Sequence, residues 1–197
     1  RTEIDFTASK YSILGKTNVY ENEFLKGALF IGPNASGKSN ALKGLSFIVK
    51  MIKGEGAAFQ NYRCLFSNNP IITAEYEFVF DNKKVEYMTE YNIQTNSISE
   101  NLKIDDITVL KRAGSTGELR IGHKVTIDDQ IDSETLFLRT ASFNTGRFPQ
   151  EPTLRKLMDF LQNSYIVDEY NWDVRTGKTI TKYAEEYGVE KINKYLD

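Results

Sequence analysis

The sequence predicts an α/β protein of the P-loop NTPase class, with an antiparallel β insertion and a helical subdomain. Three observations lead to this fold class. The loop Gly32–Ser39 fits the pattern G-x-x-x-x-G-K-[ST] at every specified position. Period-two alternation of apolar and polar residues then predicts a run of short strands, over about residues 71–128. Apolar residues at helical spacing return over residues 151–197.

Length and composition are those of an ordinary globular protein. The 197 residues are 40% hydrophobic and 26% charged, which is enough for a sizeable core. The 25 basic and 27 acidic residues give a net charge of -2. DNA is a possible partner, but this charge does not indicate it. The single cysteine, Cys64, fits a reducing compartment. No apolar stretch approaches the roughly 20 residues of a membrane span, so we expect a cytoplasmic protein without a membrane partner.

The segments around the loop come in the order that a phosphate-binding site requires. Gly27–Ile31 is a short apolar run typical of a buried parallel strand, and it leads directly into the loop. Apolar residues after the loop recur at three- and four-residue spacing and predict an amphipathic helix, with Gly54 and Gly56 after its end. The apolar positions of this helix are Ala41, Leu42, Leu45, Ile48, Val49 and Ile52.

The residue types of the loop suit a nucleoside triphosphate with Mg²⁺. Gly32 and Gly37 allow the backbone to approach phosphates closely, and the following helix turns its positive dipole end toward them. Lys38 is expected to reach the β- and γ-phosphates, and the hydroxyl of Ser39 is the candidate Mg²⁺ ligand. The candidate nucleotide-binding residues are Gly32, Pro33, Asn34, Ala35, Ser36, Gly37, Lys38, Ser39 and Asn40.

Two candidate strands precede the loop. Glu3–Thr7 alternates in polarity as a half-buried strand does, and Tyr11–Leu14 is a second short candidate. Phe6, Tyr11 and Tyr20 are candidate contacts for an adenine base, although aromatic side chains at strand spacing more commonly belong to a core.

The alternating region is predicted to form an antiparallel meander. Ala57–Pro70 is expected to be a connecting loop. The expected strands are Ile72–Phe80, Val85–Tyr91, Asn101–Ile104, Thr108–Arg112 and Glu118–Ile121, the last two joined by the glycine-rich turn Ala113–Gly117.

The rest of the chain is predicted to contain one more strand and then helices. Leu136–Ala141 is a candidate core strand. Leu154, Leu157, Met158 and Leu161 mark a helix face, and Ile180–Tyr187 and Val189–Leu196 are further candidate helices. We therefore divide the chain into a P-loop lobe, residues 1–150, and the start of a helical subdomain, residues 151–197.

The segment Phe30–Lys43 resembles the ATP-binding head of the ABC-type ATPases, the superfamily of SMC and RecF proteins, through its Asn34, Ser36 and Asn40. Within that group the chain is similar to the abortive-infection and OLD-like ATPases of bacterial phage defence. The later features of this resemblance are Glu100-Asn101-Leu102 and a strand that ends in Arg112. The resemblance implies ATP and Mg²⁺ as ligands, hydrolysis and a homodimer formed through the nucleotide. It also implies control of an effector, such as a nuclease or toxin, in bacterial phage defence or DNA maintenance.

Several segments match the family's other motifs only loosely. A signature sequence of the Leu-Ser-Gly-Gly type is absent, and Ser115–Glu118 is a poor substitute within a predicted turn. Tyr165–Glu169 resembles the apolar strand ending in Asp-Glu that would hold Mg²⁺, although a loop after a helix is the simpler interpretation. Asn144 and Gln150 are candidate Mg²⁺ contacts by the same resemblance. The catalytic residue is therefore not assigned.

The remaining polar residues give weaker signals. His123 is the only histidine, which excludes a metal cluster or catalytic arrangement with two histidines. A cluster of four basic residues could contact a phosphate backbone, although a solvated face is the simpler interpretation. These residues are Lys111, Arg112, Arg120 and Lys124.

Two alternative functions remain open at this level. One is a nucleotide-sensing scaffold that binds ATP without turnover. The other is a P-loop kinase or GTPase, although no Asn-Lys-x-Asp guanine motif is present and Asn193–Leu196 fails at its last position.

Overall fold

The computed structural model describes residues 3–8, 19–20, 24–25, 27–33, 37–54, 59–63, 68–144 and 148–164. The chain forms two compact units, residues 1–164 and residues 165–197, and all the described residues belong to the first. The predicted division at residue 150 stays a prediction. Within the described ranges, no helix is long and apolar enough to cross a membrane.

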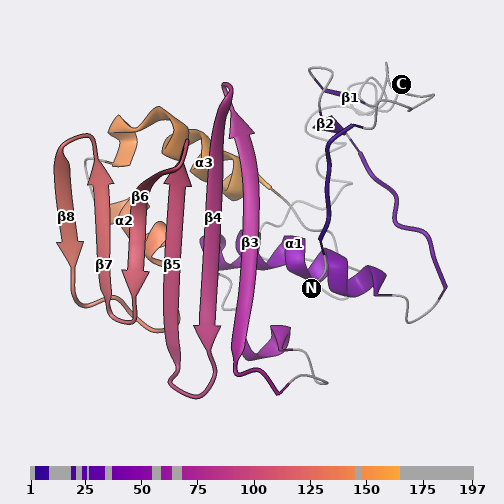
Figure 1. Ribbon diagram of the computed structural model, residues 1–197, viewed down its shortest axis with the longest axis horizontal. Helices are drawn as coiled ribbons and strands as arrows, with labels where there is room; N and C mark the ends of the chain where they lie inside the picture. Colours follow the sequence, from indigo (N-terminus) through magenta and orange to yellow (C-terminus); the bar gives the residue numbers. More distant parts are fainter. Residues whose placement is uncertain are drawn as a thin grey trace, which may run out of the picture. The chain divides into compact units, whose positions relative to one another are not determined.

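A six-stranded antiparallel meander is the main element of the first unit (Figure 1). Its strands follow the chain order, so each strand is hydrogen-bonded to its neighbours in sequence. They are β3 (Ile71–Phe80), β4 (Lys83–Asn92), β5 (Ser97–Ile104), β6 (Ile107–Ala113), β7 (Thr116–Ile121) and β8 (Lys124–Asp128). The predicted meander is confirmed, and β8 is a strand that the sequence analysis missed.

Alternation along the strands separates a buried inner face from an exposed outer face. In β4 the residues Val85, Tyr87, Thr89 and Tyr91 are all buried, as predicted, while the residues between them are half-buried. Asp81 and Asn82 make the β3–β4 turn with positive φ angles, which asparagine and aspartate tolerate better than other side chains. The registers Tyr87↔Leu102 and Leu102↔Leu110 then align the buried residues across three strands.

Three helices belong to the same unit, and their apolar residues join the inner face of the sheet in one core. They are α1 (Lys38–Lys53), α2 (Phe137–Asn144) and α3 (Pro152–Asn163), and the short 3₁₀ helices η1 (Phe59–Tyr62) and η2 (Phe148–Gln150) lie between them in the chain. The predicted face of α3 is confirmed, since the four residues that define it, Leu154, Leu157, Met158 and Leu161, are buried. The carboxylate of Glu151 accepts the N–H of Thr153 and caps the start of this helix.

Helix α1 was predicted with the correct type and end. Gly54 follows it with φ 73°, and its N–H donates to the last-turn carbonyls. The buried positions lie in the second half, at Ser46–Val49, Met51 and Ile52, whereas the predicted core residue Leu42 is 53% exposed. The apolar stripe therefore packs only along the part of the helix that lies over the sheet and its neighbouring helices.

The N-terminal segment contains a small two-stranded sheet. Val19–Tyr20 (β1) and Phe24–Leu25 (β2) are antiparallel, and Thr7 makes a bridge to Phe24. Glu3–Thr7 alternates in burial as expected, but the predicted strand is wrong, since among the described residues this segment makes one isolated bridge, at Thr7. The second candidate strand, Tyr11–Leu14, lies outside the described residues.

Two further strand predictions are wrong. Gly27–Ile31 is not a strand, and Leu29 and Ile31 are 83% and 84% exposed, because the described part of the chain offers this run no neighbouring strand to pair with. Leu136–Ala141 is helical from Phe137 onward. The buried positions Phe137, Leu138 and Ala141 have helical spacing, which a short apolar run cannot distinguish from a buried strand.

Candidate functional site

The start of α1 has the properties of an anion-binding helix terminus. Gly37 precedes the helix with φ 90°, a left-handed conformation that glycine adopts without the steric cost of a side chain. The first helical hydrogen bond runs from the N–H of Ala41 to the carbonyl of Gly37. Among the described residues no side chain caps this terminus, and its first turn has no acidic residue, so the positive end of the helix dipole favours an anion here.

Lys38 connects the two ends of the phosphate loop. Its Nζ donates hydrogen bonds to the carbonyl oxygens of Gly32, at 2.7 Å, and of Pro33, at 2.6 Å. The ammonium group therefore lies across the loop, between the chain leading into it and the first turn of α1. The structure thus brings Lys38 to Gly32 and Pro33, while the middle residues Asn34, Ala35 and Ser36 lie outside the described residues.

Ser39 and Asn40 occupy the first turn of α1 next to Lys38, and both are exposed. A serine hydroxyl in this position suits Mg²⁺, which prefers oxygen ligands and retains several waters beside the phosphate oxygens. Within the described ranges, no group of three acidic, histidine or cysteine side chains has the arrangement of a metal site. Ser39 therefore remains the candidate Mg²⁺ ligand.

The middle and the C-terminal end of α1 are attached to the rest of the unit by polar contacts. The hydroxyl of Tyr76 in β3 donates to the carbonyl of Gly44 at 2.9 Å. Nε of Arg139 in α2 donates to the carbonyl of Ile52 at 2.9 Å, and Lys53 donates to the carbonyl of Ser164. The helix that carries the phosphate loop is thus directly connected to the sheet and to α2.

A buried ion pair between β5 and β6 holds the start of α2. Glu100 and Arg112 lie 3.2 Å apart, and their side chains are 0% and 1% exposed. The Glu100 carboxylate also accepts the N–H groups of Phe137, at 2.6 Å, and Leu138, at 3.2 Å. It therefore stabilises the N-terminus of α2 both by hydrogen bonds and by its charge.

Arg112 and Tyr87 complete this network. The guanidinium of Arg112 donates to the carbonyl oxygen of Gly114 in the β6–β7 turn and to those of Asp132 and Thr135 in the loop between β8 and α2. The hydroxyl of Tyr87 donates to Glu100 at 2.7 Å. Burial raises the pKa of Tyr87 well above its ordinary value, and the negative charge of Glu100 raises it further. Tyr87 is therefore a neutral donor to the carboxylate at neutral pH.

Arg112 cannot contact a nucleic-acid backbone in this fold, so its inclusion in a basic surface cluster is wrong. The other three residues of that cluster, Lys111, Arg120 and Lys124, are exposed. Arg120 makes a surface ion pair with Glu118 at 3.0 Å. The sequence resemblance that singled out Glu100 and Arg112 found two residues that meet in space, and the structure shows that their contacts hold the fold together.

The segment weighed as a signature motif lies at the β6–β7 turn and in β7. Gly117 is buried, and a Cβ atom at this position would come within 2.5 Å of Ile131 and 2.6 Å of Phe137. The requirement for glycine here is therefore a packing requirement. His123 is exposed in the turn between β7 and β8, next to Gly122, which has φ 59°.

For the remaining candidate residues, the structure gives little more than the degree of burial. Phe6 is half-buried, and Gln150 is exposed in η2. The side chains of Tyr20 and Asn144 lie outside the described residues, as do Tyr11, Cys64, Tyr165–Glu169 and the two helices predicted after residue 179.

Comparison with known proteins identifies the family. No curated protein and no solved structure matches the chain. A family model described as "AAA domain, putative AbiEii toxin, Type IV TA system" matches residues 28–179, which is more than half of the chain and includes the phosphate loop. Together with the geometry of Lys38 across its loop, this match shows that the chain belongs to this family of nucleotide-binding AAA domains, related to abortive infection.

Proposed function

We propose that this chain is an ATP-binding and ATP-hydrolysing head domain of the ABC type, which responds to nucleotide by pairing with a second head. The observation that carries the proposal is Lys38 lying across the loop at the start of α1. The family supports it, because AAA domains are generally ATPases.

The loop residues have separate roles in this proposal. Gly37 allows the backbone N–H groups at the start of α1 to face the phosphates. Lys38 exchanges the carbonyl oxygens of Gly32 and Pro33 for phosphate oxygens, which are stronger partners because they are charged. Ser39 offers its hydroxyl to Mg²⁺, and the ion supplies positive charge that offsets the charge of the phosphates.

The contacts of α1 can transmit a change caused by nucleotide binding to the rest of the unit. Arg139 joins the end of α1 to α2, and Glu100 joins the start of α2 to the sheet. A nucleotide that binds the paired state more tightly favours that state by its difference in affinity. We propose that the resulting change controls an effector, a nuclease or toxin, in cytoplasmic phage defence.

The test is an ATP titration by calorimetry with Mg²⁺, comparing Lys38→Ala with the control Lys43→Ala. Both variants remove a lysine from α1, but Lys43 is exposed and one turn further along. Loss of a charged hydrogen bond is expected to weaken ATP binding by at least about tenfold in Lys38→Ala. The control is expected to stay within about twofold of the parent. Equal affinities in both variants would contradict the assignment of this loop.

Hydrolysis is tested separately by phosphate release. Tight ATP binding without phosphate release would support the nucleotide site but contradict hydrolysis, and it would favour the nucleotide-sensing alternative. A preference for GTP over ATP would favour the kinase or GTPase alternative.

A further inference from the structure

Strand β8 (Lys124–Asp128) forms one edge of the sheet (Figure 1). Within the described part of the chain it pairs with β7 alone. An edge strand of an antiparallel sheet directs alternate N–H and C=O groups away from its neighbour, and these groups can pair with another strand. The outward side chains Val125 and Ile127 are 45% and 68% exposed, which is unusual for β-branched apolar residues next to each other on one face.

The sequence of β8 is complementary to itself when two copies run antiparallel about Thr126. Lys124 of each copy then stands opposite Asp128 of the other, and Val125 stands opposite Ile127. Opposite charges and pairs of β-branched residues are the favourable cross-strand combinations. A two-fold axis through Thr126 also closes the assembly at two copies.

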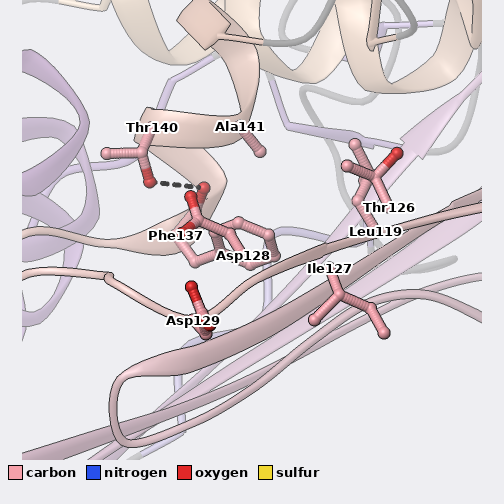
Figure 2. Close-up of a pocket in the computed structure, with 8 residues that line it drawn as sticks. All are labelled: Leu119, Thr126, Ile127, Asp128, Asp129, Phe137, Thr140 and Ala141. Carbon is pink, nitrogen blue, oxygen red and sulfur yellow. Dashed lines mark hydrogen bonds between the residues drawn. The ribbon is translucent and has the colours of Figure 1, made fainter.

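A pocket lies beside β8 at the place where the lysine of the second copy would arrive. It has a volume of about 240 Å³ and is lined by Thr126, Ile127, Asp128 and Asp129 on the sheet side, together with Leu119 and with Phe137, Thr140 and Ala141 of α2. Figure 2 shows Asp128 and Asp129 near Phe137. Directly opposite residues share a face of the sheet, so Lys124 of the second copy would lie on the same face as Asp128.

The other edge of the sheet lacks this match. Strand β3 carries Glu75 and Glu77 and no basic residue. Antiparallel pairing of two β3 strands about Tyr76 would place Glu75 opposite Glu77, which is unfavourable. Charge complementarity therefore distinguishes the β8 edge from the β3 edge.

We propose that two copies of this chain associate through β8, forming a continuous twelve-stranded antiparallel sheet in which Lys124 of each copy binds Asp128 and Asp129 of the other. This interface goes beyond the proposed pairing of heads through ATP, because it forms without nucleotide. Five residues from each strand make a small interface, so the association is expected to depend on protein concentration.

The test is sedimentation velocity over a series of protein concentrations, without and with Mg-ATP. The parent chain is expected to form a dimer without nucleotide. Lys124→Asp and Asp128→Lys each turn both symmetric charge pairs into like-charge pairs, so each variant alone is expected to associate at least about tenfold more weakly. An equimolar mixture of the two variants restores opposite charges in both pairs and is expected to recover dimer formation.

The control is Lys83→Asp. Lys83 is exposed and begins a strand after a two-residue turn, as Lys124 does, but its strand is inside the sheet. It is expected to dimerise like the parent. The interface is overturned if the parent stays monomeric without nucleotide, if it dimerises only with Mg-ATP, or if the mixture of variants remains as weak as each variant alone. Circular dichroism of each variant establishes that the fold is retained.

Discussion

Replacement of Arg112 by methionine is expected to be among the most destabilising single changes in the sheet. It leaves the buried carboxylate of Glu100 without its counter-charge and removes the donor to the carbonyls of Gly114, Asp132 and Thr135. Breaking a buried ion pair on one side costs about 3–5 kcal/mol. Because a whole domain is stable by only about 5–15 kcal/mol, this change removes a large part of the total.

The assay is urea denaturation followed by circular dichroism, with Arg120→Met as the matched control. Arg120 also forms an ion pair, with Glu118, but the two side chains are 56% and 42% exposed. Exposed pairs contribute at most about 1 kcal/mol, so the control is expected to lose little stability.

Two further variants test the reasoning about Arg112. Arg112→Lys keeps the positive charge but lacks the guanidinium fork, so it is expected to lose less stability than Arg112→Met and to remain measurable if that variant does not fold. Adding Glu100→Gln to Arg112→Met removes the unpaired charge and is expected to restore part of the loss. The reasoning is refuted if Arg112→Met and Arg120→Met lose equal stability, or if Glu100→Gln destabilises Arg112→Met further.

Two other predictions concern the same sheet and α1. Gly117→Ala places a methyl group against Ile131 and Phe137 and is expected to cost about 1–3 kcal/mol, whereas Gly44→Ala, which has open space in mid-helix, is expected to stabilise by about 0.5–1 kcal/mol. Equal midpoints in urea would contradict this difference. Tyr87→Phe removes a donor to Glu100 and is expected to be less stable than the parent at neutral pH. The raised pKa of Tyr87 means that the folded state keeps its proton above about pH 10, where the unfolded tyrosine ionises, so this contribution to stability is lost as the pH rises. The stability gap between parent and Tyr87→Phe should therefore narrow above about pH 10 in urea titrations, and a constant gap would count against the buried position of this hydroxyl.

Local sequence patterns predicted the parts of the fold that rely on local interactions. The β3–β4 hairpin follows from strict alternation around Asp81 and Asn82, and the end of α1 follows from Gly54. The loop Gly32–Ser39 pointed to the family, because its residue types stand at the fixed spacing of a phosphate-binding motif and the family match includes it. Strand β8 was missed because its short, mixed sequence gives a weak alternation signal, although the Gly122-His123 turn marks its start.

By itself, then, the sequence determined the family, the helix after the loop Gly32–Ser39, and the meander. Tertiary structure decided the features that depend on distant neighbours. Leu136–Ala141 has the composition of a strand, but the carboxylate of Glu100, which comes from another part of the chain, accepts the first N–H groups of a helix there. An arginine is usually exposed at the surface, but Arg112 is buried because it lies opposite Glu100 in the sheet and pairs with it. Residue type and local spacing determine local conformational preferences. Burial and charge pairing depend on which strands and helices pack against each other.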